Sequence, residues 1–259
     1  MRSKAVIAII AVVLLAPLVF SGCRQGADLE LSKKFQAAQK AFDEASSPDE
    51  FLKVAALYQE IRDIDGISGA VLYNQGNAFM RAGRRGRAIA AYRQAERYRP
   101  NDPYLEANLR YALAAHDATP QRRPVVEYLL FWQDWCSYPA KFYLAAAVTI
   151  ATFILGLISL LTRRRLFTRL AIGGVVLVAL LVFSAGYDWY RYDHLVHGVV
   201  VEDEVVARKG NGAGYEPAFT EPLPEGTEFR VVNRRGKWLL IRLPGDQEGW
   251  IEQGAAVVY

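Results

Sequence analysis

Hydrophobic and polar residues follow three successive patterns along the chain. Residues 30–117 place apolar side chains at helical spacing, whereas residues 142–162 and 170–187 contain no charged residue. From residue 198 to 259 the apolar spacing changes to two, and glycine and proline turns multiply. The chain is therefore predicted to be a multi-domain membrane protein with α-helical hairpins, a transmembrane α-hairpin and a small all-β domain.

The two uncharged runs are 21 and 18 residues long. At about 1.5 Å per helical residue the shorter run extends about 27 Å, close to the hydrocarbon core of about 30 Å. Buried helices of soluble proteins seldom run this far without a polar face, so both runs are predicted to cross a membrane. Aromatic residues typical of a membrane interface gather at their outer ends: Trp132, Trp135, Tyr138, Phe142, Tyr143, Tyr187, Trp189, Tyr190 and Tyr192.

The segment 163–169 between the runs carries Arg163, Arg164, Arg165 and Arg169. Short arginine-rich loops stay in the cytoplasm, so this segment is predicted to be a cytoplasmic loop that also contacts anionic lipid headgroups. Both flanking regions then lie on the outer side of the cytoplasmic membrane. The four charges equal the formal net charge of +4, so the rest of the chain has no positive excess, which argues against a nucleic-acid partner.

The N-terminal residues 1–23 combine a short cationic start, an apolar run and small residues, which is typical of an export signal. The ending "VFSGC" resembles the lipobox of bacterial lipoproteins, which implies lipidation of Cys23; simple cleavage and an uncleaved anchor are the alternatives. Residues 124–136 are predicted to form an amphipathic helix along the outer interface, with Cys136 at its end as a free thiol or a small apolar residue.

Within the helical region, "LYNQGNAFMRAGRRGRAIAAYRQAERYRPNDP" predicts two helices, Gly69–Ala82 and Gly86–Tyr98, separated by a stop at Gly83. Small residues permit close approach of the helices, and larger ones fill the space around them. The order of these packing residues resembles a tetratricopeptide repeat: Gly76, Phe79, Ala88, Tyr92, Ala95 and Pro100. Residues 34 apart also agree, since Tyr58 precedes Tyr92 and Asn74 precedes Asn108 by that period.

The resemblance implies a groove lined by the first helix of each hairpin, which binds an extended peptide. It assigns Asn74, Asn77, Arg81 and Asn108 to that groove, where their side chains could hydrogen-bond a peptide backbone. Solvated side chains without a ligand are the alternative for the asparagines.

The C-terminal region, residues 198–259, predicts strands separated by "GNGAG", "LPEG", "NRRG" and "PGDQEG". Its inward positions are expected to be Phe229, Val231, Trp238, Leu240 and Trp250. The turn "LPEG", the Trp238 strand and the sequence "GWI" resemble a bacterial SH3 domain, a family that binds cell-wall peptides or proteins.

Catalytic chemistry finds little support in the sequence. Two cysteines cannot supply a disulfide framework or a four-ligand metal site. Asp193, His194 and His197 in "DHLVH" could hold a metal on a helix, but a linker at the membrane interface explains them better because a fourth ligand is not evident. No catalytic motif is found either, so we expect a non-enzymatic protein without metal or cofactor.

The order of the modules resembles the BatE-type proteins of bacterial aerotolerance operons: signal sequence, tetratricopeptide repeats, two transmembrane helices and an SH3 domain. The resemblance implies an adaptor in an aerotolerance or envelope stress complex. Its partners would be envelope proteins, among them von Willebrand A-domain Bat proteins, and a MoxR-type ATPase system. Binding of peptidoglycan through the SH3 domain is the alternative function.

Overall fold

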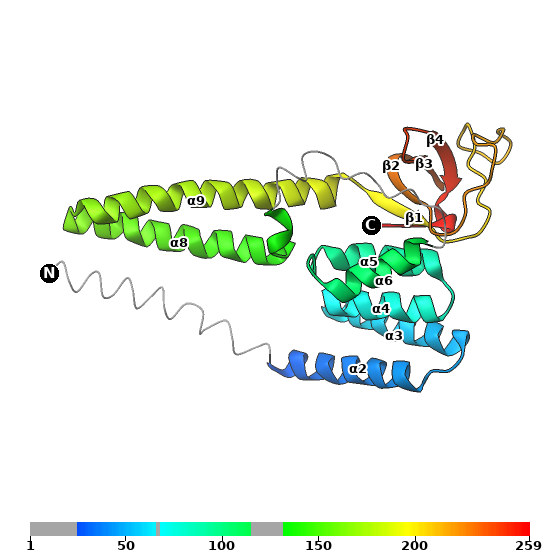
Figure 1. Cartoon of the computed structure of the whole chain (residues 1–259), viewed down its shortest axis with the longest axis horizontal. Coiled ribbons are helices and arrows are strands. Elements are labelled where there is room, and N and C mark those ends of the chain that lie inside the picture. The colour runs from blue at the N-terminus through cyan, green and yellow to red at the C-terminus, as the bar shows by residue number, and fades with distance from the viewer. Residues whose placement is uncertain (1–24, 66–67, 115–131) are drawn as a thin grey trace.

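The computed structural model describes residues 25–65, 68–114 and 132–259. The predicted signal with Cys23 and most of the predicted interfacial helix at 124–136 lie outside these residues. A mostly helical N-terminal region, a pair of long apolar helices and a C-terminal β-sheet follow one another along the chain (Figure 1).

The N-terminal region consists of helices in which each runs antiparallel to the one before it: α2 (Gln25–Glu44), α3 (Pro48–Asp65), α4 (Gly69–Arg81), α5 (Arg85–Glu96) and α6 (Pro103–Ala114). One apolar cluster joins α2, α3 and α4, and a second joins α4, α5 and α6. Gly83 ends α4 with φ +72°, and the amide of Arg84 donates to the carbonyl of Phe79 at 2.9 Å. This 6→1 bond is typical of a glycine-terminated helix, so the predicted stop at Gly83 is confirmed.

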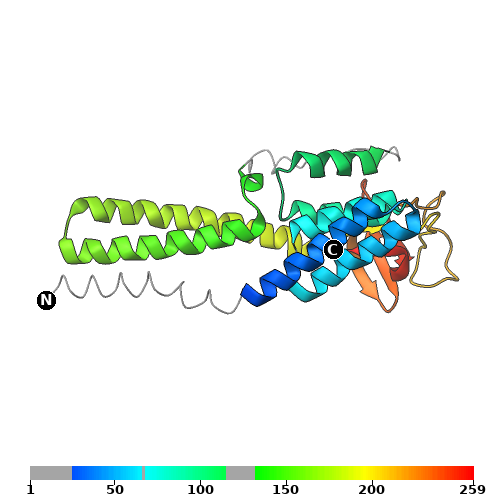
Figure 2. The same ribbon diagram turned by 90° about the horizontal axis from the view of Figure 1, so that it is seen from below.

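The apolar hairpin consists of α8 (Tyr138–Thr162) and α9 (Arg165–Trp189), which extend away from the rest of the molecule (Figures 1 and 2). Both helices are long and apolar enough to cross a membrane by length and composition. Large apolar side chains along them are exposed, for example Phe153 and Leu160. Such surface requires an apolar environment that the described residues do not supply.

The bounds of this hairpin differ from those predicted. The connection is only Arg163 and Arg164, with Arg163 at φ 53°, whereas Arg165 and Arg169 lie in the first turns of α9. The loop at 163–169 was therefore predicted too long. The helices also extend outward beyond the uncharged runs and include Lys141 and Asp188, because these two charges pair with each other.

The C-terminal sheet has the strand order β4-β3-β2-β1-β5, and neighbouring strands are antiparallel. Its strands are β1 (His197–Val200), β2 (Glu228–Arg235), β3 (Trp238–Arg242), β4 (Glu248–Glu252) and β5 (Ala256–Val258). Short helical turns lie at Gln133–Trp135 (η1), Tyr190–His194 (η2) and Gln253–Ala255 (η3). The all-β prediction for this region is confirmed.

The core of the sheet differs in part from the predicted set. Phe229 is buried in the main cluster, Val231 packs against that cluster and Trp238 is buried. Leu240 and Trp250 were wrongly placed in the core: they are half-buried partners across β3 and β4. Neighbours one residue away on the opposite face supply the core instead: Leu239, Ile241 and Ile251.

The helical region and the C-terminal sheet together form a head at one end of the apolar hairpin (Figures 1 and 2). Helix α5 packs against β1 and β5, so the two regions are in direct contact. Val199 of β1 is fully buried within the cluster of α4, α5 and α6. The head is therefore one packed unit rather than two separate modules.

Candidate functional site

Helices α4 and α5 pack closely where Gly76 faces Tyr92. A Cβ atom at Gly76 would lie 2.6 Å from Cδ1 of Tyr92 and nearer still to Cε1, which is inside van der Waals contact. Ala88 and Ala95 are completely buried, and Phe79 is half-buried against both apolar clusters. The predicted packing residues Phe79, Ala88, Tyr92 and Ala95 therefore belong to one apolar cluster, and Pro100 follows α5 in the loop to α6.

The three predicted groove asparagines lie on α4 and α6 and make hydrogen bonds within the protein. Asn77 Oδ1 accepts from the Tyr92 hydroxyl at 2.8 Å and from Asn108 Nδ2 at 2.9 Å. Asn108 Nδ2 also donates to the Tyr73 hydroxyl at 3.1 Å, while Asn74 Nδ2 reaches Gln39 Oε1 at 3.4 Å. These amides therefore join neighbouring helices, and each keeps a second polar atom without a hydrogen-bond partner among the described residues.

Arginine side chains gather at the turn between α4 and α5. Arg81, Arg84 and Arg87 are exposed and Arg85 is half-buried. Within the part of the chain that the structure describes, none of the four forms an ion pair; the ion pairs of this region involve Arg93, Arg97, Arg99 and Arg110 instead. This turn is a positively charged surface at the C-terminal end of α4, on the helix that also carries Asn74 and Asn77.

A buried polar contact not expected from the sequence connects α3, α4 and α5. Gln75 is 3% exposed; its Nε2 donates to the Ala55 carbonyl at 3.1 Å and its Oε1 accepts from Arg62 at 2.9 Å. Arg62 also donates to Gln94 at 3.2 Å. Burial lowers the pKa of Arg62, since the charged form loses hydration. Only the helical spacing of these polar residues could have hinted at the contact.

The interface between α5 and the sheet is built around Arg93. Its guanidinium contacts both carboxylate oxygens of Glu228 on β2, at 2.6 and 3.0 Å, and it donates to Glu96 at 3.0 Å. Burial by itself lowers the Arg93 pKa, but the hydrogen bonds and charges of these carboxylates raise it overall. Burial raises the pKa of Glu96 against the opposing effect of Arg93. A two-pronged contact of this kind fixes the orientation of α5 on the sheet.

The start of α5 is also held by the sheet region. Arg84 precedes the helix and provides no side-chain cap. Glu225 supplies that cap from the far region of the chain, because its Oε1 accepts from the backbone amide of Gly86 at 2.8 Å. A Cβ at Gly86 would clash with the Val200 carbonyl and lie 3.0 Å from the Val201 Cα. The closeness of α5 and β1 thus depends on glycine at this position.

The "DHLVH" residues lie at the junction of the head and the apolar hairpin, without meeting at a common site. Asp193 pairs with Arg97 at 3.0 Å, and the His194 ring lies 4.4 Å from that of Trp189. His197 exchanges backbone hydrogen bonds with Tyr259. No group of three or more His, Cys, Asp or Glu residues able to hold a metal is found in the described ranges.

A buried polar cluster joins the base of α8 to the base of α9. Lys141 Nζ lies 2.5 Å from Asp188 Oδ2 and 2.5 Å from Gln133 Oε1, and Ser184 Oγ donates to the same Gln133 oxygen at 2.7 Å. All four residues are buried. The cluster ties η1 and both helices together where the hairpin meets the head.

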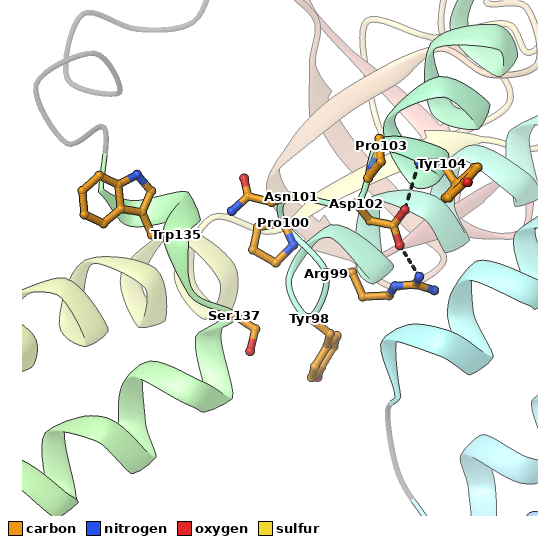
Figure 3. Close-up of a pocket in the computed structure, with 9 residues that line it drawn as sticks. All are labelled: Tyr98, Arg99, Pro100, Asn101, Asp102, Pro103, Tyr104, Trp135 and Ser137. Carbon is orange, nitrogen blue, oxygen red and sulfur yellow. Dashed lines mark hydrogen bonds and ion pairs between the residues drawn. The ribbon is translucent and has the colours of Figure 1, made fainter.

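A shallow hollow of about 550 Å³ lies between the α5–α6 loop and the start of α8 (Figure 3). Tyr98, Tyr104 and Trp135 contribute aromatic rings, and Arg99 pairs with Asp102 at its edge. Asp102 also accepts from the backbone amide of Tyr104 at 2.9 Å, which caps α6. The hollow is open to its surroundings and belongs to the hairpin side of the head.

Comparison with known proteins bears on the α4–α5 hairpin. Residues 69–102 match the family model of the tetratricopeptide repeat. The chain therefore contains this repeat, and proteins with such repeats generally use them to bind other proteins. The preceding hairpin has an equivalent feature, because Tyr58 on α3 is as completely buried as Tyr92. No curated protein and no solved structure matches the chain.

Proposed function

We propose that this protein is a non-enzymatic adaptor, anchored in the bacterial cytoplasmic membrane by α8 and α9, whose tetratricopeptide repeat binds other envelope proteins. The match at residues 69–102 carries the proposal. By its resemblance to BatE-type proteins, the adaptor serves an aerotolerance or envelope stress complex, with von Willebrand A-domain Bat proteins and a MoxR-type ATPase as partners.

The packing of the head supports a hairpin whose two ends are on one side of the membrane. Arg93 precedes α8 and Glu228 follows α9, yet their side chains are 2.6 Å apart. This contact requires both flanks of the hairpin on the same face. The arginine turn at its tip then favours the cytoplasm for the tip and the outer face for the head, including its SH3-like sheet.

The groove side of α4 and α6 is the partner site in this proposal. The amide atoms of Asn74, Asn77 and Asn108 that have no partner among the described residues can hydrogen-bond an extended backbone. Arg81, exposed at the C-terminal end of α4, adds a positive charge for a carboxylate of the partner.

Affinity capture from solubilised membranes tests the adaptor role. Arg81→Glu should reduce recovery of the Bat-type partner, because it reverses the charge at the groove without removing a packing contact. Lys53→Glu makes the same charge change on an exposed position of α3 and should leave recovery unchanged. Equal recovery with both variants, or no envelope protein with the native chain, would argue against the proposal.

Reporter fusions test the orientation separately. A reporter active only outside the cytoplasm should be active when fused after Tyr259 and inactive when inserted between Arg163 and Arg164. The reverse pattern would place the head in the cytoplasm and contradict an envelope function.

Peptidoglycan binding is a second candidate, favoured by the aromatic surface of the sheet region. Tyr215 is 54% exposed, and Trp250 is half-buried with Arg235 over its ring at 5.8 Å. The full chain in detergent should sediment with purified sacculi and lose this binding in Tyr215→Ala. Tyr111→Ala, an exposed tyrosine of α6, is the matched control.

A further inference from the structure

We propose that the hairpin-side end of the helical region is itself a lipid-binding surface, which rests on the bilayer that α8 and α9 cross. The inference depends on the membrane anchoring proposed above. It adds a second contact between head and lipid, away from the hairpin.

The helices of the head present their ends to this side. α2 and α6 begin there, α3 and α5 end there, and the axes of these helices run roughly along the hairpin (Figures 1 and 2). In both views the start of α2 is level with the base of the hairpin. A bilayer around α8 and α9 therefore reaches the first turns of α2.

Large apolar side chains are exposed at these helix ends. Leu29, near the start of α2, is 60% exposed, and Ile64, near the end of α3, is 61% exposed. Because α2 and α3 are antiparallel and joined at residues 45–47, both positions lie at the hairpin end of the helix pair. On the other side of the α5–α6 loop, Tyr104 and Trp135 line the open hollow and are also exposed.

The opposite end of the same two helices is built differently. Phe42 and Phe51 pack edge to face there at 5.4 Å between ring centres, with Phe51 buried and Phe42 half-buried. At the hairpin end Ile61 and Leu31 also pack into the core, but Leu29 and Ile64 remain outside it and exposed. This asymmetry is expected if lipid covers the hairpin end.

Charged neighbours indicate how deep the contact reaches. Lys33 and Lys34 follow Leu29 along α2 and can extend toward lipid phosphates. Glu30 and Asp63 are exposed beside the apolar pair and keep it out of the hydrocarbon core. The geometry fits a contact at headgroup depth, made with phospholipid.

Lipid-borne quenching tests the inference on the full chain. Single cysteines at Ile64→Cys, Asp49→Cys and Leu160→Cys, in a background of Cys23→Ser and Cys136→Ser, would carry a fluorescent label. The protein would be placed in bilayer discs of phosphatidylcholine and phosphatidylglycerol, with or without a lipid bearing a shallow nitroxide. Asp49 is exposed at the far end of the same helix as Ile64, and Leu160 is exposed on α8.

The expected result is loss of fluorescence at positions 64 and 160 but not at 49, and Leu29→Cys on α2 should repeat the loss at position 64. Quenching at 160 with equal signals at 64 and 49 would overturn this inference and leave membrane anchoring intact. A label at 160 that neither a shallow nor a deep nitroxide quenches would contradict the anchoring itself and the inference with it.

Discussion

The absence of a Cβ atom at two glycines allows helices and strands of the head to approach closely. At Gly76 and Gly86 the neighbouring group occupies the space that a Cβ would need, whereas Gly156 and Gly173 of the apolar hairpin have no such neighbour within 4 Å. The two kinds of glycine look alike in sequence. Only Gly76 could be singled out, because the repeat pattern assigns a close helix crossing to that position.

Gly76→Ala should destabilise the head. The added methyl group would overlap the Tyr92 ring, and overpacking of this kind costs about 1–3 kcal/mol. Thermal unfolding of the full chain in detergent measures the loss, with Gly156→Ala as a control that should unfold at the native temperature or above. A Gly76→Ala protein as stable as the control would contradict the described crossing.

His197 should make the head less stable in acid. Burial lowers its pKa below the ordinary 6.5, with a smaller unfavourable effect from Arg191 and Arg230. As the pH falls, the unfolded chain therefore binds a proton at a higher pH than the folded chain does. The neutral buried His197 stabilises the folded state above about pH 6.5, and this stabilisation is lost as the pH falls through the lowered pKa. Glu228 and the Leu195 carbonyl oppose the shift without reversing it.

The measurement is the unfolding temperature of detergent-solubilised protein between about pH 7.5 and pH 5. His197→Gln should flatten the decline, because the side chain no longer titrates. His194→Gln retains His197 and should keep the native slope. Identical slopes for the native protein and His197→Gln would refute this role.

Among the elements, the apolar hairpin depends on a buried charge pair at its base. Lys141 and Asp188 immediately flank the uncharged runs, so the sequence predicts spans that exclude them, yet they lie inside α8 and α9 and contact each other. A pattern of charges shows where a run stops but not whether two charges will neutralise one another. The pair also fixes Gln133 and so holds η1 against both helices.

Lys141→Met should be more damaging than removal of both charges. The single variant leaves Asp188 buried without its cation, a loss of about 3–5 kcal/mol. Lys141→Met/Asp188→Leu removes that penalty and should recover much of the stability. Unfolding temperatures in detergent compare the two, and equal losses would mean that the pair is not buried in the folded protein.

The strands illustrate a different limit of sequence reasoning. Alternation predicted Leu240 and Trp250 as inward positions, whereas the core cluster takes Leu239, Ile241 and Ile251 from the same two strands. A register shift between Val231 and Asn233 in β2 changes the pairing with β3. Such a bulge leaves no signal in the sequence, so the register of β2 against β3 could not be predicted by regular alternation.

At the scale of the whole molecule, contacts between distant segments join the helical region and the sheet. The repeat hairpin was predictable because its spacing, glycines and period are local. Arg93 and Glu228 are 135 residues apart, and the sequence around each is typical of a surface charge. Their ion pair could therefore not be predicted from the sequence. The resemblance to the repeat family singled out Asn74, Asn77 and Asn108, but the hydrogen bonds they make depend on side-chain directions that only the folded head defines.

A double-mutant cycle should measure the interface pair. Arg93→Met and Glu228→Gln are expected to show a coupling energy of up to about 3 kcal/mol, because the contact is two-pronged and largely shielded from solvent. The exposed pair Lys209–Glu216, at 2.8 Å, should couple by less than about 1 kcal/mol. Comparable coupling in both cycles would contradict a special role for Arg93.

Because Glu225 caps α5, this helix can be completed only after the C-terminal region has been synthesised. The acceptor is 139 residues beyond the amide that it caps, and the apolar hairpin lies between them. At about 5–20 residues per second, synthesis of that stretch lasts on the order of ten seconds. Throughout this interval the repeat hairpin exists without its sheet, and the surface that later buries Val199 stays uncovered. The nascent protein would therefore benefit from a chaperone at this stage, and a chain truncated before Glu225 would be an early target for proteases.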